Sequence, residues 1–166
     1  MSENYKKDFP LLMQDNIIYF DNSATSQRPQ CVIDAEVSFY MNHNANPLRG
    51  SYPLSVEATD IYENARQTVR KFINAAHSEE IVFTRNTTES MNLVAYSYGL
   101  NNVKEGDEVL VSIMEHHSNL LPWQMVCRQT GATLKFIDCE QDGSLDLNKV
   151  SELITDKTKI VAITQV

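Results

Sequence analysis

The pattern of apolar and polar positions along the chain predicts an α/β protein. The clearest helix runs from Ala58 to Ile73, where apolar residues recur at i, i+3, i+4 and i+7 and charged residues lie on the other side. Further helices are predicted at 30–41, 88–100, 119–129 and 146–154, and strands at 17–20, 80–84, 107–112, 133–138 and 159–165. From residue 80 onward strands and helices alternate, which predicts crossover units and a mostly parallel sheet flanked by helices.

The last apolar run favours a longer parent protein. "KIVAITQ" (159–165) is nearly all apolar, as is typical of a strand buried on both faces, and no helix follows to cover it. We therefore expect a fragment that is truncated after a strand, although a self-standing module ending on an edge strand is an alternative.

Composition and charge narrow the class of protein. The 166 residues are 42% hydrophobic with a net charge of −8, which is typical of a globular chain and argues against a nucleic-acid surface. The basic residues between Arg66 and Lys71 have the spacing of a solvent-facing side of a helix. No signal peptide or membrane-spanning run is present. Three distant cysteines without a C-x-x-C favour a reducing cytoplasm, with Cys31 and Cys127 expected in the core.

A first candidate site follows the predicted strand 80–84. Asn86, Thr87 and Thr88 precede a helix, and Glu89 lies three residues after Asn86, which suits a reciprocal cap. The free N–H groups of a helix start, together with two hydroxyls, can bind a phosphate. The alternative is that Asn86 or Thr87 only caps the helix.

A second candidate follows the strand 107–112. In "EHH" (115–117) consecutive side chains point to opposite sides of an extended segment, and no third ligand is present at a known spacing, so we expect no metal. An imidazole can stack on a flat ring and exchange a proton near neutrality. Alternatively, Ser118 or Asn119 caps the next helix and the histidines are loop residues. If the two strands are near neighbours, both sites could hold one flat phosphorylated ligand.

Four segments resemble a known family in order and spacing. "YFDNSATSQRPQCVIDA", "LRGSYPLSVEAT", "FTRNTTESMNLVA" and "MEHHSNLLPWQ" are similar to the N-terminal part of SufS-like cysteine desulfurases, and the resemblance runs from about Asp8 to Val166. These enzymes have the class V aminotransferase fold and use pyridoxal 5′-phosphate (PLP). The resemblance implies an incomplete large domain of the aspartate aminotransferase-like fold type I. Residues 1–50 would be an N-terminal segment at the cofactor and dimer side, and residues 51–166 a partial PLP-binding α/β domain.

The resemblance also implies roles for single residues. Thr87 and Thr88 match the pair that binds the cofactor phosphate, and His116 matches the catalytic histidine that stacks on the pyridine ring. The residues expected near the substrate are Ser23, Ala24 and Arg49. L-Cysteine would be the substrate of a homodimeric cytoplasmic enzyme that passes sulfur to an acceptor protein of iron–sulfur cluster assembly. His117 and Glu115 receive no role.

Several positions depart from the family pattern. Leu48 stands where a histidine is common, Asn86 where a glycine is common, and Gln165 where a histidine is common. The Schiff-base lysine, the aspartate that pairs with the pyridine nitrogen and the sulfur-accepting cysteine match no residue of this chain, so we expect the fragment alone to be inactive. Two alternatives stay open. One is another class V PLP enzyme, such as a selenocysteine lyase, a β-eliminating lyase or an aminotransferase. The other is a non-catalytic α/β binding module.

Overall fold

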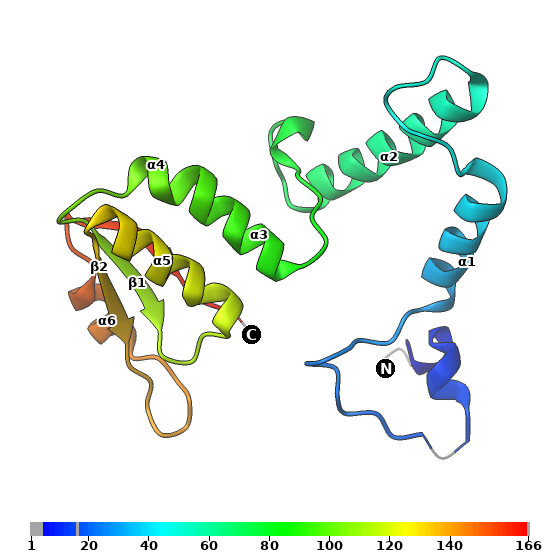
Figure 1. Ribbon diagram of the computed structural model, residues 1–166. Helices are drawn as coiled ribbons and strands as arrows, with labels where there is room; N and C mark the ends of the chain where they lie inside the picture. The colour runs from blue at the N-terminus through cyan, green and yellow to red at the C-terminus, as the bar shows by residue number, and fades with distance from the viewer. Residues whose placement is uncertain (1–4, 16, 166) are drawn as a thin grey trace. The chain divides into compact units, whose positions relative to one another are not determined.

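The computed structural model describes residues 5–15 and 17–165, which form two units, Met1–Val82 and Phe83–Val166 (Figure 1). The N-terminal unit contains short 3-10 helices at Tyr5–Asp8, Pro10–Met13 and Ser78–Glu80, α1 (Gln30–Ser38) with a π-helical turn at Phe39–His43, and α2 (Pro53–Phe72). The C-terminal unit contains α3 (Thr87–Val94), a π-helical turn (Ala95–Gly99), α4 (Leu100–Asn102), β1 (Glu108–Ser112), a 3-10 turn (His117–Asn119), α5 (Leu121–Thr130), β2 (Thr133–Ile137), α6 (Leu147–Leu153) and β3 (Thr158–Ala162).

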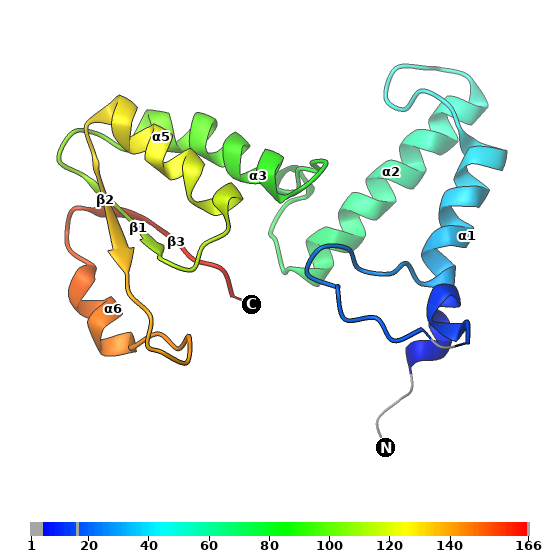
Figure 2. The ribbon, with the colours of Figure 1, turned by 60° about the horizontal axis from the view of Figure 1, so that its bottom comes forward.

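The C-terminal unit is a parallel sheet between helices, as the pattern predicted. Its strand order is β2-β1-β3, and β1 pairs in parallel with both neighbours. Helices α3, α4 and α5 lie on one side of the sheet and α6 on the other (Figures 1 and 2). Because side chains alternate along a strand, Val109 and Val111 of β1 pack with Trp123 and Val126 of α5, while Leu110 is buried on the opposite face. The core therefore surrounds β1, and the carboxyl end of β1 leads directly into Glu115 and His116.

Two glycines allow α5 to pack where it does. Gly131 follows α5 with φ +79°, and its N–H donates to the Cys127 carbonyl at 3.0 Å, which is the left-handed helix end expected at this position. Gly99 faces α5, and a Cβ added there would lie 2.9 Å from Cγ2 of Val126. The absence of a side chain at Gly99 thus allows the backbone of this turn to approach α5 closely.

The two strands predicted at 17–20 and 80–84 are wrong. Ile81 has extended backbone angles, φ −94° and ψ 115°, but no strand of the described chain pairs with either segment. A strand is defined by hydrogen bonds to a neighbour, so an apolar run without a partner stays irregular. The side chains of both segments are correspondingly open to solvent, with Phe20 91% and Val82 64% exposed.

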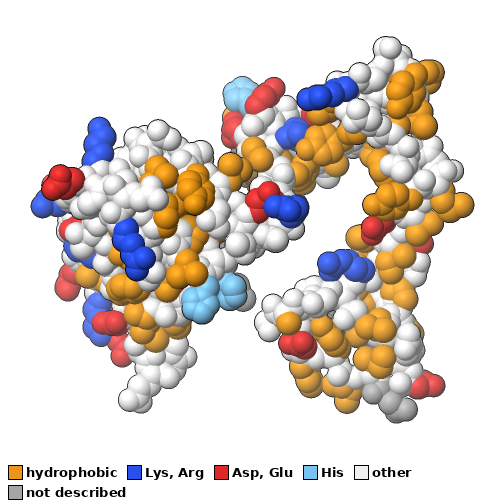
Figure 3. Space-filling model, viewed as in Figure 1, with side chains coloured by type: hydrophobic (Ala, Val, Ile, Leu, Met, Phe, Trp, Pro, Cys, Tyr) orange, Lys and Arg blue, Asp and Glu red, His pale blue; other side chains and the backbone are white. Residues whose placement is uncertain are grey.

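The N-terminal unit buries few side chains. Within its described residues only Ser55, Ala58 and Ile81 are buried, and α1 buries none. Apolar side chains are instead visible on its surface (Figure 3). The expectation that Cys31 is a core thiol is therefore wrong, since nothing covers it in α1, whereas Cys127 in α5 is buried as expected. Among the helices that the structure describes, none is both long and apolar enough to cross a membrane.

Candidate functional site

The two predicted binding segments border one hollow in the C-terminal unit. The hollow has a volume of about 370 Å³ and lies where the start of α3 meets the turn after β1. Its lining residues are Thr88, Asn92, Tyr96, His116, His117, Ser118, Leu121, Pro122 and Met125. The fold thus brings Thr88 and His116 together, although 28 positions separate them in the sequence.

The start of α3 has the donors that an anion needs. Asn86 is the N-cap, and its side chain accepts a hydrogen bond from the Glu89 amide at 2.9 Å. Thr87 and Thr88 occupy the first two helical positions, where amides have no acceptor within the helix. Within residues 5–15 and 17–165 no hydrogen bond uses either threonine hydroxyl. Two amides and two hydroxyls therefore lie at the positive end of the helix dipole, and of the two threonines Thr88 lines the hollow while Thr87 does not.

Glu89 does not complete the reciprocal cap that the sequence suggested, in which its carboxylate would accept a hydrogen bond from the Asn86 amide. Its carboxylate accepts from the Arg85 amide at 2.6 Å and not from the amide of Asn86. It also forms an ion pair with the Arg85 guanidinium at 3.3 Å. The backbone hydrogen bond from Arg85, followed by the bond from its side chain, lowers the pKa of Glu89 below its ordinary value. The Arg85 charge offsets that of Glu89, so this carboxylate does not exclude an anion from the helix start.

The His116 ring is held in place through one of its nitrogens. Nδ1 accepts a hydrogen bond from the Ser118 amide at 3.1 Å and lies 2.9 Å from the Ser118 hydroxyl oxygen. Because an N–H donor faces Nδ1, the neutral imidazole carries its proton on Nε2. His116 therefore caps the 3-10 turn, and the N-cap of the next helix, α5, is Leu120 and not Ser118 or Asn119. Nε2 is the atom that can exchange a proton with a ligand.

Glu115, which received no role from the sequence, directly precedes His116 and is buried. Its side chain is 8% exposed and accepts hydrogen bonds from the Ser112 hydroxyl at 2.6 Å, the Asn119 amide group at 2.7 Å and the Thr164 backbone amide at 3.0 Å. Burial raises the pKa of Glu115, but these hydrogen bonds outweigh burial, and the pKa is lowered overall. Glu115 is thus a charged acceptor that joins the ends of two neighbouring strands.

The remaining residues considered from the sequence are His117, Ser23, Ala24 and Arg49. His117 lines the same hollow and is exposed. Ser23 and Ala24 lie in a turn where the Ala24 amide donates to the Asp21 carbonyl at 3.2 Å, and Arg49 lies in an exposed loop. All three belong to the N-terminal unit, so their nearness to the substrate stays a prediction. No group of three His, Cys, Asp or Glu side chains in the described residues is placed to bind a metal.

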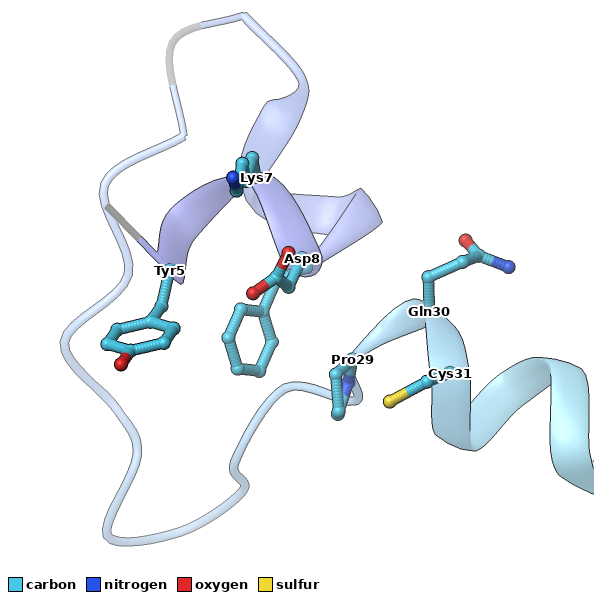
Figure 4. Close-up of a pocket in the computed structure, with 7 residues that line it drawn as sticks. Tyr5, Lys7, Asp8, Pro29, Gln30 and Cys31 are labelled. Carbon is cyan, nitrogen blue, oxygen red and sulfur yellow. The ribbon is translucent and has the colours of Figure 1, made fainter. Parts of the chain in front are cut away.

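A second hollow lies in the N-terminal unit, between the first 3-10 helices and the start of α1 (Figure 4). Its volume is about 530 Å³, and Lys7, Asp8 and the exposed Cys31 contribute to its walls. Neither of the two predicted binding segments borders it. The hollow at Thr88 and His116 is therefore the better candidate for a cofactor.

The fold and this site define a class of protein. A parallel α/β sheet with a helix start and a histidine at the carboxyl ends of its strands is the arrangement of α/β proteins that bind phosphorylated ligands at that edge. The family model "Aminotransferase class-V" matches residues 18–166, and the chain belongs to this family. The chain is 49% identical over 170 residues to a "Probable cysteine desulfurase" from Synechocystis sp., covering all of this chain and 40% of the relative.

Solved structures extend this similarity. The apo structure of cysteine desulfurase from Thermococcus onnurineus NA1 is 44% identical with a TM-score of 0.89, covering 99% of this chain and 40% of that one. A more distant structure, 20% identical with a TM-score of 0.77 over 95% of this chain, contains glycine covalently linked to a PLP cofactor. The chain therefore spans about 40% of the length of these relatives. The expected fold, the N-terminal part of a fold type I PLP domain, is confirmed.

Proposed function

We propose that this chain is the N-terminal portion of a PLP-dependent cysteine desulfurase, which converts L-cysteine to L-alanine and transfers the sulfur to a cysteine of the enzyme. The observation that carries the proposal is that Thr88 and His116 line one hollow. It is supported by the identity to proteins named as cysteine desulfurases over the whole chain.

The residues of the hollow fit the cofactor. Thr87 and Thr88 would bind its phosphate through two amides and two hydroxyls, aided by the dipole of α3. His116 would stack on its ring, in the orientation set by Ser118. When bound, PLP supplies an electron sink for bonds at the α-carbon of an amino acid. His116 Nε2 would hold or release a proton beside that carbon.

Further parts of the proposal concern substrate and partners. We place Ser23, Ala24 and Arg49 near the bound L-cysteine. We also propose a cytoplasmic homodimer that gives its sulfur to an acceptor protein of iron–sulfur cluster assembly. The exposed apolar side chains of α1, such as Val32 and Val37, support packing of the N-terminal unit against more protein.

The test uses the full-length protein that carries this chain. The protein is loaded with PLP and incubated with L-cysteine, L-selenocysteine or other amino acids, and alanine and sulfide are measured. The proposal expects equal amounts of alanine and transferable sulfur from L-cysteine. Pyruvate in place of alanine would favour a β-eliminating lyase, and a strong preference for selenocysteine would favour a selenocysteine lyase. A protein that binds no PLP would contradict the proposal.

A further inference from the structure

The buried carboxylate of Glu115 accepts hydrogen bonds from three separate parts of the chain. Ser112 is the last residue of β1, Asn119 ends the 3-10 turn, and Thr164 follows β3. Oε1 accepts from the Ser112 hydroxyl and the Thr164 amide, and Oε2 accepts from Asn119 Nδ2. Glu115 therefore fixes the ends of two parallel strands relative to the turn between β1 and α5.

The direction of these hydrogen bonds is determined by Trp123. The indole Nε1–H can only donate, and it donates to Asn119 Oδ1 at 3.0 Å. Asn119 must then present its NH₂ group toward Glu115, where only an acceptor fits. A glutamine at 115 would place an NH₂ group against that of Asn119, or would turn its NH₂ group toward the Ser112 and Thr164 donors. If Asn119 instead turned over, the Trp123 N–H would lose its acceptor.

His116 lies between the two buried members of this network. Its peptide group follows Glu115 directly, and its carbonyl accepts from the Asn119 amide at 2.8 Å. The His116 backbone is thus joined on both sides to residues that are 8% and 6% exposed, while its own ring is open to the hollow.

The geometry points to Glu115 as a positioning residue that holds the His116 imidazole at the cofactor face of the hollow and joins it to the end of β3. This inference rests on the proposed function, because the ring is taken to stack on PLP. No Lys or Arg forms an ion pair with Glu115 among the described residues. The charge is therefore balanced by the hydrogen bonds from Ser112, Asn119 and Thr164, and these same bonds fix the chain on both sides of His116.

The test compares two carboxylates at opposite ends of β1 in the full-length protein: Glu108 in its first position and Glu115 in the turn that follows it. Glu115→Gln removes the charge at the carboxyl end of β1. Glu108→Gln, the matched control, does so at the amino end, where Glu108 accepts from Lys135 Nζ and Thr155 Oγ1, both at 2.8 Å. Both variants should lower stability. Only Glu115→Gln should shift the His116 ring signal in the NMR spectrum of the cofactor-free protein and the circular dichroism of bound PLP. It should also reduce kcat on the order of 10- to 100-fold.

A compensating pair sharpens the test. In the double variant Glu115→Gln/Asn119→Asp, the glutamine NH₂ group donates to the new carboxylate, which still accepts from the Trp123 N–H. The glutamine oxygen still accepts from Ser112 and Thr164. Each of the four hydrogen bonds again joins a donor to an acceptor. We therefore expect kcat and the His116 ring signal to return most of the way to their wild-type values.

Three results would overturn the inference: a Glu115→Gln enzyme with wild-type kcat and His116 signal, equal effects in Glu108→Gln, or no recovery in the double variant. If Glu115→Gln does not fold, Ser112→Ala removes a single donor, and an unchanged His116 signal in that variant overturns the inference. A wild-type protein without PLP or cysteine chemistry contradicts the proposed function instead. The NMR comparison of the cofactor-free proteins still tests Glu115 in that case.

Discussion

The close approach of Gly99 to α5 allows a quantitative test of the fold around the site. Gly99 is buried and has helical angles, φ −56° and ψ −58°, so alanine meets no backbone strain there. Gly to Ala in a helix normally stabilises by about 1 kcal/mol. The new Cβ would, however, lie 2.9 Å from Val126 Cγ2, and Val126 is completely buried. Overpacking of this kind costs about 1–3 kcal/mol. We therefore expect Gly99→Ala to destabilise by about 1 kcal/mol.

The assay is urea unfolding of the full-length protein, followed by far-UV circular dichroism. Val126→Ala alone should cost about 2 kcal/mol, because it deletes two buried methyl groups. The double variant should cost about 1 kcal/mol less than the sum of the two, since the smaller side chain makes room for the new Cβ. Ser97→Ala, on the exposed side of the same turn, is the control. A Gly99→Ala protein that is more stable than wild type by about 1 kcal/mol would refute the close packing.

Three further predictions concern other parts of the molecule. Thr88→Val should weaken PLP binding about tenfold by removing one charge-assisted hydrogen bond. Thr130→Val should not, because the Thr130 hydroxyl bonds only to Val126 and Ala132 at the end of α5. Absorbance titration measures both Kd values, and equal values would contradict the phosphate site. The folded-state pKa of Glu115 is lowered from its ordinary value of 4.5, so its contribution to stability is complete above the unfolded pKa and is lost as the pH falls through the folded value. Urea midpoints should therefore fall more between about pH 5 and pH 3 in wild type than in Glu115→Gln, and parallel curves would contradict this. Leu48 has φ 70°, which is unfavourable for any residue other than glycine. Leu48→Gly should therefore raise the free energy of unfolding by about 1 kcal/mol in the same urea assay, and a loss of stability would be evidence against that conformation.

Much of the C-terminal unit could be predicted from the sequence. The strands at β1, β2 and β3 have apolar runs whose partners lie within the chain, so pattern and structure agree. The runs at 17–20 and 80–84 are similarly apolar but pair with no strand in the described part of the chain, and an apolar run alone cannot distinguish the two cases. The burial of Cys127 and the exposure of Cys31 differ for the same reason, because burial depends on what packs over a helix.

Some residues of the candidate site could also be predicted from the sequence, and others could not. Thr88 and His116 could be predicted because each follows an apolar run and begins a helix or turn, and the fold brings them to one hollow. Glu115 could not, since its partners Ser112 and Asn119 are local but Thr164 is 49 residues away. The polar residues Ser112, Glu115 and Asn119 lie three and four positions apart, which indicates contacts among these three but gives no sign of the contact with Thr164.

The most direct measurement is the structure of the full-length protein with PLP bound. The phosphate oxygens should accept hydrogen bonds from the first turn of α3, including Thr87 and Thr88, and the His116 ring should lie on the cofactor ring. A phosphate bound elsewhere in the protein, or a His116 ring with no contact to the cofactor, would contradict the central claim.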